Sequence, residues 1–393
     1  MWLYNLGISL YAGGIRLAAL WHGKARLWSE GRRNIFERME AAVRPSDRIV
    51  WVHAASLGEF EQARPIIERL RAEHPEYKIR KNYEGADYVF YLPADTPSNA
   101  RRFLDIVHPE IAIFIKYEFW INLLSELRRR KVRSYIVSAI FRRNSVFFRP
   151  YGAMWRQALE TFDTLFVQNV ESKRLLSEIG FDNVVVAGDT RFDRVAQIAA
   201  AAQRVETIER FRGGGRLFVA GSTWGPDEEI LLPLVNANPD VKFVIAPHEM
   251  DEGRIAHLMR NAKGGAVRYT QCDAATRFDD VQVLVLDTMG MLSSVYGSAT
   301  WAYVGGGFGV GIHNTLEAAT FGLPIAFGPN YGKFKEARDM VSLGCAVSVR
   351  TAGELAAWFA PLCDDEETLR RASRTAKDYT ARNQGATGII LRS

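Results

Sequence analysis

Residues 49–74, IVWVHAASLGEFEQARPIIERLRAEH, join an apolar run to a charged, amphipathic run through a turn of small residues. The opening letters, IVWVHA, do not alternate between apolar and polar, which is typical of a strand buried on both faces of a parallel sheet. The letters from Glu61 onward have the spacing of a helix. A strand that leads at once into a helix is the repeating unit of doubly wound α/β proteins.

The same unit recurs along the whole chain. Further strands are predicted in the first half at YVFYLP (88–93), IAIFIK (111–116), SYIVSA (134–139), TLFVQN (164–169) and NVVVAG (183–188). The second half repeats the rhythm at RLFVAG (216–221), KFVIAP (242–247), VQVLVLD (281–287), WAYVGG (301–306), PIAFGP (324–329) and CAVSVR (345–350). Between them lie helical patterns such as residues 96–108, where Thr96 is a cap and Pro97 a first helical residue. The sequence therefore predicts two doubly wound α/β domains.

The length of 393 residues also favours two domains over one core. The boundary is expected near residues 194–215, RVAQIAAAAQRVETIERFRGGG, where an Ala-rich helix ends in three glycines and can serve as a hinge. The predicted parts are a segment 1–44, a domain 45–195 and a domain 196–393 with a helical end. In such pairs the ligand is expected in a cleft between the domains, at the carboxyl ends of the strands.

The composition is that of an ordinary globular protein, with 48% hydrophobic and 24% charged residues. The formal net charge of +5 favours an anionic partner without naming one. The three cysteines are scattered, which argues against a disulfide framework and a structural zinc site, and fits a reducing compartment.

The first 21 residues, MWLYNLGISLYAGGIRLAALW, are apolar and aromatic apart from Asn5 and Arg16. The apolar length before Arg16 is shorter than a clean membrane span, and no signal-peptide features flank it. Residues 16–44 then hold seven Lys or Arg against three Glu. This order predicts a helix attached to a membrane surface, either lying flat or spanning it. The alternative is a hydrophobic helix packed on the first domain.

Residues 303–314, YVGGGFGVGIHN, form a glycine-rich loop between a predicted strand and a helix that starts near Asn314. Glycines such as Gly307 let the backbone approach a ligand, and a helix start offers N–H groups to a phosphate. The alternative is a glycine loop without a ligand. Asn314 and Glu317 fit either an N-terminal cap or contacts with a ribose.

Three other loops in the second half also follow predicted strands, so all are expected at one nucleotide site. Ser222 and Thr223 are candidate phosphate donors, with helix capping as the alternative role. Pro247 and His248 end another strand, and His248 is either a phosphate or base contact or a structural histidine. The third loop is Met289-Gly290-Met291-Leu292.

Two glutamates follow strands of the first half. Ser56-Leu-Gly-Glu59 has the pattern of a helix capping box, but Glu59 also stands where a general base would face a cleft. Glu118 follows the strand 111–116 and could orient an acceptor or pair with a basic residue.

Residues 127–159 contain nine Lys or Arg and no Asp or Glu, mixed with aromatic residues. Nucleic acid, an anionic lipid head group and a solvated basic face are the three interpretations. The apolar N-terminus favours the lipid head group, with Arg128, Arg142, Arg143 and Arg149 as candidate phosphate contacts and no nucleic acid as a partner.

Taken in order, these motifs resemble one family. HAASLGEFEQARPIIERL, DTPSNARRFLDIVHPEIAIFIKYEFW, VQNVESKRLLSEIGF, GDTRFD, AGST, APH, MGML and GGGFGVGIHNTLEAA are together similar to the bacterial 3-deoxy-D-manno-octulosonic acid (Kdo) transferases. The similarity runs nearly from end to end, including the N-terminal segment.

The resemblance implies a GT-B glycosyltransferase that moves Kdo from CMP-Kdo to a lipid A precursor with inversion, at the cytoplasmic face of the bacterial inner membrane. It implies no metal and no cofactor. Glu59 would be the catalytic base and Glu118 the acidic residue of the acceptor domain. The CMP-binding segments would hold Ser222, Pro247, His248, Met289 to Leu292, Asn314 and Glu317.

The chain departs from the family pattern at three places. Pro247 and His248 are adjacent where the family usually has an Arg between them, Met291 stands where a Glu is common, and Ile79 runs directly into Arg80 where the family has a longer piece. Two other functions stay open: another GT-B transferase or an epimerase that uses a UDP-sugar, and a membrane-attached binding protein without catalysis.

Overall fold

The computed structural model describes residues 1–78 and 87–392, so the Ile79–Arg80 junction lies outside the described residues. The chain divides into two compact units, Met1–Arg194 with Gly385–Ser393, and Val195–Gln384. The division after Arg194 is one residue from the boundary expected from the sequence. The end of the chain differs from that expectation, because α18 (Ala386–Leu391) belongs to the first unit.

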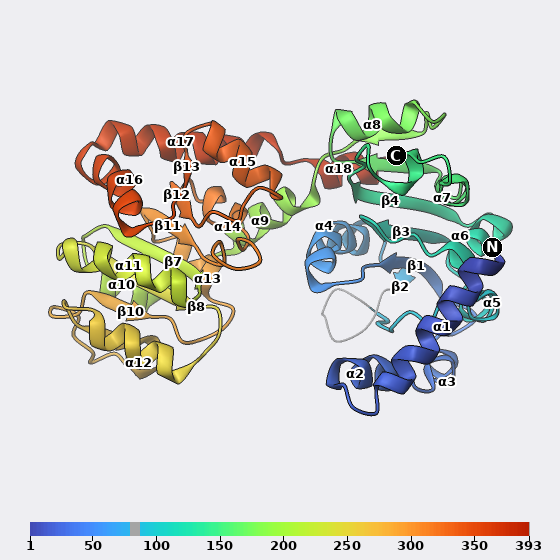
Figure 1. Cartoon of the computed structure of the whole chain (residues 1–393), viewed down its shortest axis with the longest axis horizontal. Coiled ribbons are helices and arrows are strands. Elements are labelled where there is room, and N and C mark those ends of the chain that lie inside the picture. Colours follow the sequence, from blue (N-terminus) through green and yellow to red (C-terminus); the bar gives the residue numbers. More distant parts are fainter. Residues whose placement is uncertain (79–86, 393) are drawn as a thin grey trace. The chain divides into compact units, whose positions relative to one another are not determined.

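The first unit is built on a parallel sheet of the order β2-β1-β3-β4-β5-β6 (Figure 1). Its strands are β1 (Arg48–His53), β2 (Tyr77–Lys78), β3 (Ile111–Ile115), β4 (Arg133–Ala139), β5 (Thr164–Val167) and β6 (Val184–Val186). The connecting helices are α4 (Leu57–Glu73), α5 (Pro97–Val107), α6 (Ile121–Arg130), α7 (Ala153–Leu159) and α8 (Val170–Ser177), with a 3-10 turn η1 (Val146–Phe148). The helix α9 (Thr190–Ala201) begins in the first unit and continues into the second.

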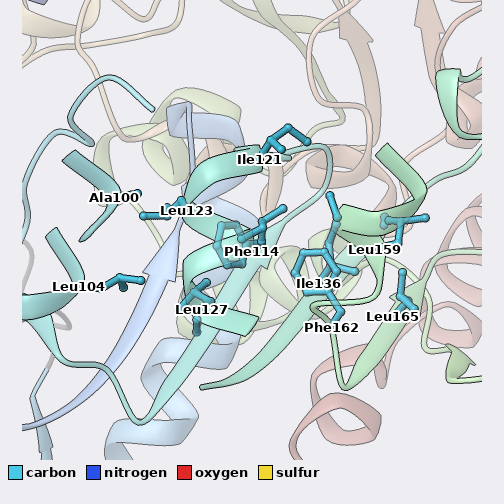
Figure 2. Packing of buried hydrophobic residues seen from close by; sticks show 14 of the residues in the cluster. Ala100, Leu104, Phe114, Ile121, Leu123, Leu127, Ile136, Leu159, Phe162 and Leu165 are labelled. Carbon is cyan, nitrogen blue, oxygen red and sulfur yellow. The ribbon is translucent and has the colours of Figure 1, made fainter. Parts of the chain in front are cut away.

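Both faces of this sheet are covered, as the non-alternating apolar runs predict. Phe114 and Ile136 contribute to one face, where Figure 2 shows Leu123 and Leu127 of α6 beside Phe114. Residues of the same strands with the opposite parity, such as Ile113 and Val137, pack on the other face with α4. Side chains alternate between the faces of a strand, so a strand covered on both faces needs apolar residues at successive positions.

The predicted start of α5 is confirmed. Thr96 is the N-cap, its hydroxyl accepts a hydrogen bond from the N–H of Asn99, and Pro97 is the first helical residue.

The strand predicted at residues 88–93 is wrong. Tyr88, Phe90 and Leu92 pack against the core, but the segment does not form a strand. The carbonyl of Leu92 accepts a hydrogen bond from Nε of Arg32, and the hydroxyl of Tyr88 donates to Asp47. The Arg32 side chain therefore satisfies the Leu92 carbonyl, which in a strand would pair with a neighbouring backbone.

The second unit holds a parallel sheet of the order β13-β12-β11-β7-β8-β10-β9. Its strands are β7 (Leu217–Thr223), β8 (Lys242–Pro247), β9 (Ala266–Arg268), β10 (Val283–Val285), β11 (Trp301–Val304), β12 (Ile325–Phe327) and β13 (Ala346–Ser348). The helices are α10 (Glu206–Arg212), α11 (Gly225–Ala237), α12 (Glu252–Asn261), α13 (Leu292–Tyr296), α14 (Leu316–Thr320), α15 (Lys335–Ser342), α16 (Ala352–Asp364) and α17 (Glu366–Arg382), with a 3-10 turn η2 (Tyr269–Gln271). Apolar clusters cover both faces of this sheet too.

The single helix expected across residues 194–215 is two helices. The chain leaves helical geometry after α9 and re-enters it in α10, with Val205 extended at the N-cap. Ile208 and Phe211 of α10 are fully buried in the core of the second unit. The gain from burying these two side chains explains why the helix breaks and turns onto the sheet.

The N-terminus forms α1 (Trp2–Ala18), α2 (Gly23–Gly31) and α3 (Ile35–Ala42). α1 has no fully buried residue, and its exposed side chains include Trp2 (71%), Leu10 (66%) and Leu17 (60%). Within residues 1–78 and 87–392, no helix combines the length and apolar character that crossing a membrane requires.

Candidate active site

The strand orders place one switch point in each sheet. In the first unit the chain runs from β1 to its edge neighbour β2 and then returns to β3 on the other side of β1. Glu59 follows β1 and Glu118 follows β3, so both lie near the carboxyl ends of the two strands that flank the switch point. Ligands of open α/β sheets bind at such points.

Glu118 belongs to a three-residue cluster. Its Oε2 lies 3.0 Å from Nε2 of His53 and accepts a hydrogen bond of 2.8 Å from Nε1 of Trp120. His53 and Glu118 are largely enclosed, with side-chain exposures of 11% and 15%. The contacts are satisfied when Nε2 of His53 carries a proton, since both nitrogens then donate to one carboxylate oxygen.

The charged form of Glu118 is favoured by these donors. Burial alone would raise the pKa of the carboxyl, but the hydrogen bonds from His53 and Trp120 and the charge of His53 outweigh it, and the pKa lies below its usual value. The cluster therefore holds an ionised carboxylate in a partly enclosed position, suited to orienting a hydroxyl or a cationic group.

Glu59 makes the helix-cap contacts that its sequence pattern predicts. Its N–H donates to Oγ of Ser56 at 3.3 Å, and its Oε2 accepts from the N–H of Ala55 at 2.8 Å. The cap thus occupies one carboxylate oxygen, and in the described part of the chain Oε1 has no hydrogen-bond partner. A half-buried carboxylate with one oxygen held and the other open can accept a proton in a fixed direction.

The predicted arginine contacts are not all on one edge of the sheet. Arg142 and Arg143 follow the carboxyl end of β4, as Glu118 follows β3. Arg128 lies in the last turn of α6, which leads to the amino end of β4 and hence to the opposite edge. Arg149 follows η1. The structure brings Arg142 and Arg143 to the edge of Glu118 and leaves Arg128 away from it.

Acidic partners also reduce the charge of this stretch. Arg128 pairs with Glu160 at 2.6 Å, and Arg143 pairs with Glu178 at 3.1 Å. Both acids lie outside residues 127–159, so the sequence count within that stretch could not reveal them. Such exposed pairs exchange readily with an incoming phosphate, because each contributes little to stability.

In the second unit the switch point lies between β7 and β11. Three rings gather at the ends of β7, β8 and β11. The rings of Trp224 and His248 have centroids 4.8 Å apart, and those of His248 and His313 are 4.4 Å apart. Nε1 of Trp224 also donates to Nε2 of His313 at 3.3 Å. Burial, followed by the neighbouring His248, lowers the pKa of His313, so this ring is the neutral acceptor of the set.

Thr223 is not available as a phosphate donor. Its side chain is completely buried, and Oγ1 donates to Glu228 at 2.9 Å. Its carbonyl accepts from the N–H of His248, which ties the ends of β7 and β8 together. Ser222 is half-buried beside it and remains the candidate donor of the pair.

The glycine loop is shaped first by the protein's own backbone. A Cβ on Gly305 would lie 2.2 Å from the carbonyl oxygen of Ser222, and one on Gly307 would lie 2.6 Å from the backbone of Gly328. The N–H of Gly306 donates to the buried carboxylate of Asp227, which also accepts from Tyr303 and from the N–H of Trp224. Close packing and Asp227 thus fix the loop beside the ring cluster.

The helix expected to begin near Asn314 differs from that expectation. α14 is only five residues long, and its N-cap is Thr315. A helix of this length has a weak dipole, so it adds little to phosphate binding. Asn314 and Glu317 are joined by a hydrogen bond of 3.0 Å, and Glu317 also accepts from Ser293 at 2.9 Å. These side chains form a polar rim next to the loop.

The MGML loop divides into two parts. Met289 is 76% exposed and Gly290 has a left-handed backbone, whereas Met291 and Leu292 pack on the core of the second unit. The side chain of Leu292 lies directly under Gly221, where a Cβ would approach it to 2.8 Å. Pro247 is buried at the end of β8, and the exposed His248 follows it.

The sequence analysis missed the residues that hold these groups in place, namely His53, Trp120, Trp224, Asp227 and His313. His53 carried a usable signal, because it lies at the carboxyl end of the predicted strand IVWVHA. Asp227 carried none beyond its place in the first turn of a helix, since its three partners come from separate segments.

Comparisons with known proteins agree with one another. A family model described as 3-Deoxy-D-manno-octulosonic-acid transferase (kdotransferase) matches residues 32–194. A 3-deoxy-D-manno-octulosonic acid transferase of Bordetella pertussis is 28% identical over 368 residues, covering 87% of this chain and 86% of that protein. The protein of the same name from Haemophilus influenzae is 24% identical, covering 88% and 86%.

Among solved structures, a putative UDP-N-acetylglucosamine 2-epimerase from Listeria monocytogenes has a TM-score of 0.61 at 14% identity, covering 88% of this chain and 95% of that one. The UDP-GlcNAc 2-epimerase from Methanocaldococcus jannaschii has a TM-score of 0.53 at 14% identity, covering 85% and 98%. At such low identity these likenesses concern the fold alone.

Proposed function

We infer that this chain, which belongs to the 3-deoxy-D-manno-octulosonic acid (Kdo) transferase family, is a glycosyltransferase that moves Kdo from CMP-Kdo to a lipid A precursor. The observation that carries the proposal is the pair of glutamates at the switch point of the first sheet: Glu59, with one oxygen held and one open, and Glu118, kept ionised by two donors. The second sheet offers the rings and the glycine loop to the nucleotide.

Glu59 is the proposed general base. Its open oxygen takes the proton of an acceptor hydroxyl while that hydroxyl oxygen attacks the anomeric carbon of Kdo. The new bond from oxygen to carbon forms as the bond from that carbon to the CMP phosphate oxygen breaks, and CMP leaves with the electron pair. Direct displacement inverts the anomeric centre. Base catalysis of this kind is worth about 10²–10⁴-fold.

The donor is assigned to the second unit. Ser222, His248 and N–H groups of the glycine loop are the proposed contacts of the CMP phosphate. Asn314 and Glu317 are the proposed contacts of its ribose. Donors of this kind stabilise the charge that develops on the leaving phosphate. The proposal assigns no metal and no cofactor to the step, because one phosphate carries less charge than a diphosphate.

The acceptor is assigned to the first unit and to a membrane surface. The exposed apolar side chains of residues 1–21 would enter the interface, with Arg142, Arg143 and Arg149 offered to anionic groups of the acceptor. The proposal puts the reaction at the cytoplasmic face of a bacterial inner membrane, where a nucleotide sugar and a lipid precursor would meet.

The test is an assay of the purified protein with CMP-Kdo and a tetra-acylated lipid A precursor, followed by mass spectrometry of the lipid. Each transfer should add the mass of one Kdo residue. Absence of any added mass in folded protein would overturn the proposal. Thermal stabilisation by CMP rather than UDP separates it from a UDP-sugar enzyme, a comparison that matters because the fold is shared with UDP-GlcNAc 2-epimerases.

A further inference from the structure

α1 is tied to the interior of the first unit by its first turn. The hydroxyl of Tyr4 donates to Oδ2 of Asp95 at 2.7 Å and accepts from the N–H of Ile121 at 3.4 Å. Oδ1 of Asn5 accepts from Nδ2 of Asn122 at 2.8 Å. Two neighbouring residues of a helix that has no fully buried residue therefore reach the start of α6.

Asp95 is the centre of this contact. It is 3% exposed, and it accepts hydrogen bonds from the N–H groups of Asn122 and Leu123 as well as from Tyr4. The N-cap residue of α6, Trp120, has no side-chain cap of its own. Asp95 thus caps α6 from a distant loop, and Tyr4 supplies one of the donors that a buried carboxylate needs.

The start of α6 is also part of the candidate active site. Trp120, the N-cap of α6, directs its indole N–H to Glu118, and the same nitrogen lies 3.0 Å from Nε2 of His53. Ile121, whose N–H meets the Tyr4 hydroxyl, is the next residue. A single peptide bond therefore separates the contact made by α1 from the indole that holds Glu118.

We propose that Tyr4 is a positioning residue for the Glu118–His53 pair, acting through Asp95, the first residues of α6 and the indole of Trp120. The inference rests on the proposed function and deepens it, because the helix assigned to the membrane surface also sets the geometry of the acceptor site. Loss of the Tyr4 hydroxyl should loosen the first turn of α6 and let the Trp120 indole drift from Glu118.

The conservative variant for this test is Tyr4→Phe. It removes the hydroxyl and keeps the ring, which packs edge-on against Trp155 with centroids 6.5 Å apart. Asp95 keeps its two backbone donors, so the variant should fold. Tyr379→Phe is the matched control, because the Tyr379 hydroxyl also donates to a carboxylate, that of Asp339, at 2.9 Å in the second unit.

Hydrogen exchange of the amides of residues 121–123 is the first readout, and it does not depend on any activity. We expect exchange several-fold faster in Tyr4→Phe than in the wild type, and unchanged exchange there in Tyr379→Phe. If these amides exchange in Tyr4→Phe at the wild-type rate, the positioning role proposed for Tyr4 is wrong, even if the wild type transfers Kdo. If the wild type transfers no Kdo, the proposed function is wrong. The exchange measurement then still tests whether Tyr4 orders the first turn of α6.

Turnover is the second readout. In Tyr4→Phe we expect kcat for Kdo transfer to fall about tenfold with little change in the KM for CMP-Kdo, the size expected for one hydrogen bond. Combined with Trp120→Phe, the loss should be clearly less than the product of the single losses, because both changes act on one contact. Two outcomes would overturn the positioning role: a kcat loss in the double variant equal to the product of the single losses, or a loss in Tyr379→Phe equal to that in Tyr4→Phe. Either would indicate a general effect on stability.

Discussion

Nε2 of His53 lies 3.0 Å from Oε2 of Glu118, and the two residues come from different strands of the first sheet. His53 ends β1, and Glu118 follows β3, which pairs with β1 in parallel so that His53 stands opposite Phe114. The parallel register brings a buried imidazole and a carboxylate together at the switch point, 65 residues apart in the chain. We therefore expect the proposed acceptor site to depend on pH.

Trp120→Phe should shift the acidic limb of the pH–rate profile upward. The pKa of Glu118 lies below its usual value because hydrogen bonds from His53 and Trp120 favour the carboxylate, so activity that needs the carboxylate is lost only when pH falls through that low value. Removing the indole N–H raises the pKa, and the loss then begins at higher pH. The measurement is a profile of kcat/KM over roughly pH 4 to pH 8. An acidic limb at the same pH in the variant and the wild type would contradict the role assigned to Glu118.

Glu59→Gln should abolish most of the activity without disturbing the fold. A Gln side-chain oxygen can still accept from the N–H of Ala55, so the helix cap is kept while the proton acceptor is lost. We expect a fall in kcat of about 10²–10⁴-fold, with thermal stabilisation by CMP unchanged. Transfer at a near wild-type rate would show that Glu59 is a cap and not a base.

Asp227→Asn should weaken nucleotide binding. The carboxylate accepts from Tyr303, Trp224 and Gly306, and an amide oxygen with an adjacent NH₂ cannot satisfy the same three donors. We expect the Kd for CMP, measured by calorimetry, to rise by about tenfold. Asp251→Asn, which changes an exposed N-cap of α12 in the same unit, is the control and should leave the Kd unchanged.

Gly305→Ala should destabilise the second unit strongly, whereas Gly309→Ala should not. A methyl group at Gly305 would collide with the carbonyl of Ser222 at 2.2 Å, but at Gly309 its nearest neighbour would be 3.6 Å away. Relief of such an overlap requires a backbone shift that costs about 1–3 kcal/mol. Thermal unfolding in the presence and absence of CMP measures the difference. Equal melting temperatures for the two variants would contradict the close packing.

Leu10→Glu combined with Leu17→Glu should reduce binding to vesicles of phosphatidylethanolamine and phosphatidylglycerol. Both leucines are largely exposed on α1, and each would contribute about 1.5–3 kcal/mol if buried in an apolar phase. Leu343→Glu, at an exposed leucine of the second unit, is the control. The measurement is co-sedimentation with the vesicles. Equal binding of the double variant and the Leu343→Glu control would contradict a role of residues 1–21 in membrane binding.

The sequence by itself determined the fold class, the positions of nearly all strands and the resemblance to one family. Strands buried on both faces need continuous apolar runs, and such runs can be recognised directly in the sequence. The motifs around Glu59 and the glycine loop also indicated a resemblance to the Kdo transferases, and the family model and curated relatives agree with that resemblance. The helix start at Thr96 and Pro97 was also predicted from the sequence, because a helix cap joins residues only three positions apart.

Only the tertiary structure decided which polar groups meet. His53 with Glu118, Asp227 with Gly306 and Tyr4 with Asp95 are joined across 65, 79 and 91 residues, and no local pattern marks them as partners. Two predictions from the sequence failed for the same reason. The Thr223 hydroxyl donates to Glu228 and is not available to a phosphate, and Arg128 lies at the edge of the sheet opposite Glu118. Partner choice depends on strand order and burial, because a buried polar group must bond with whatever the fold brings beside it.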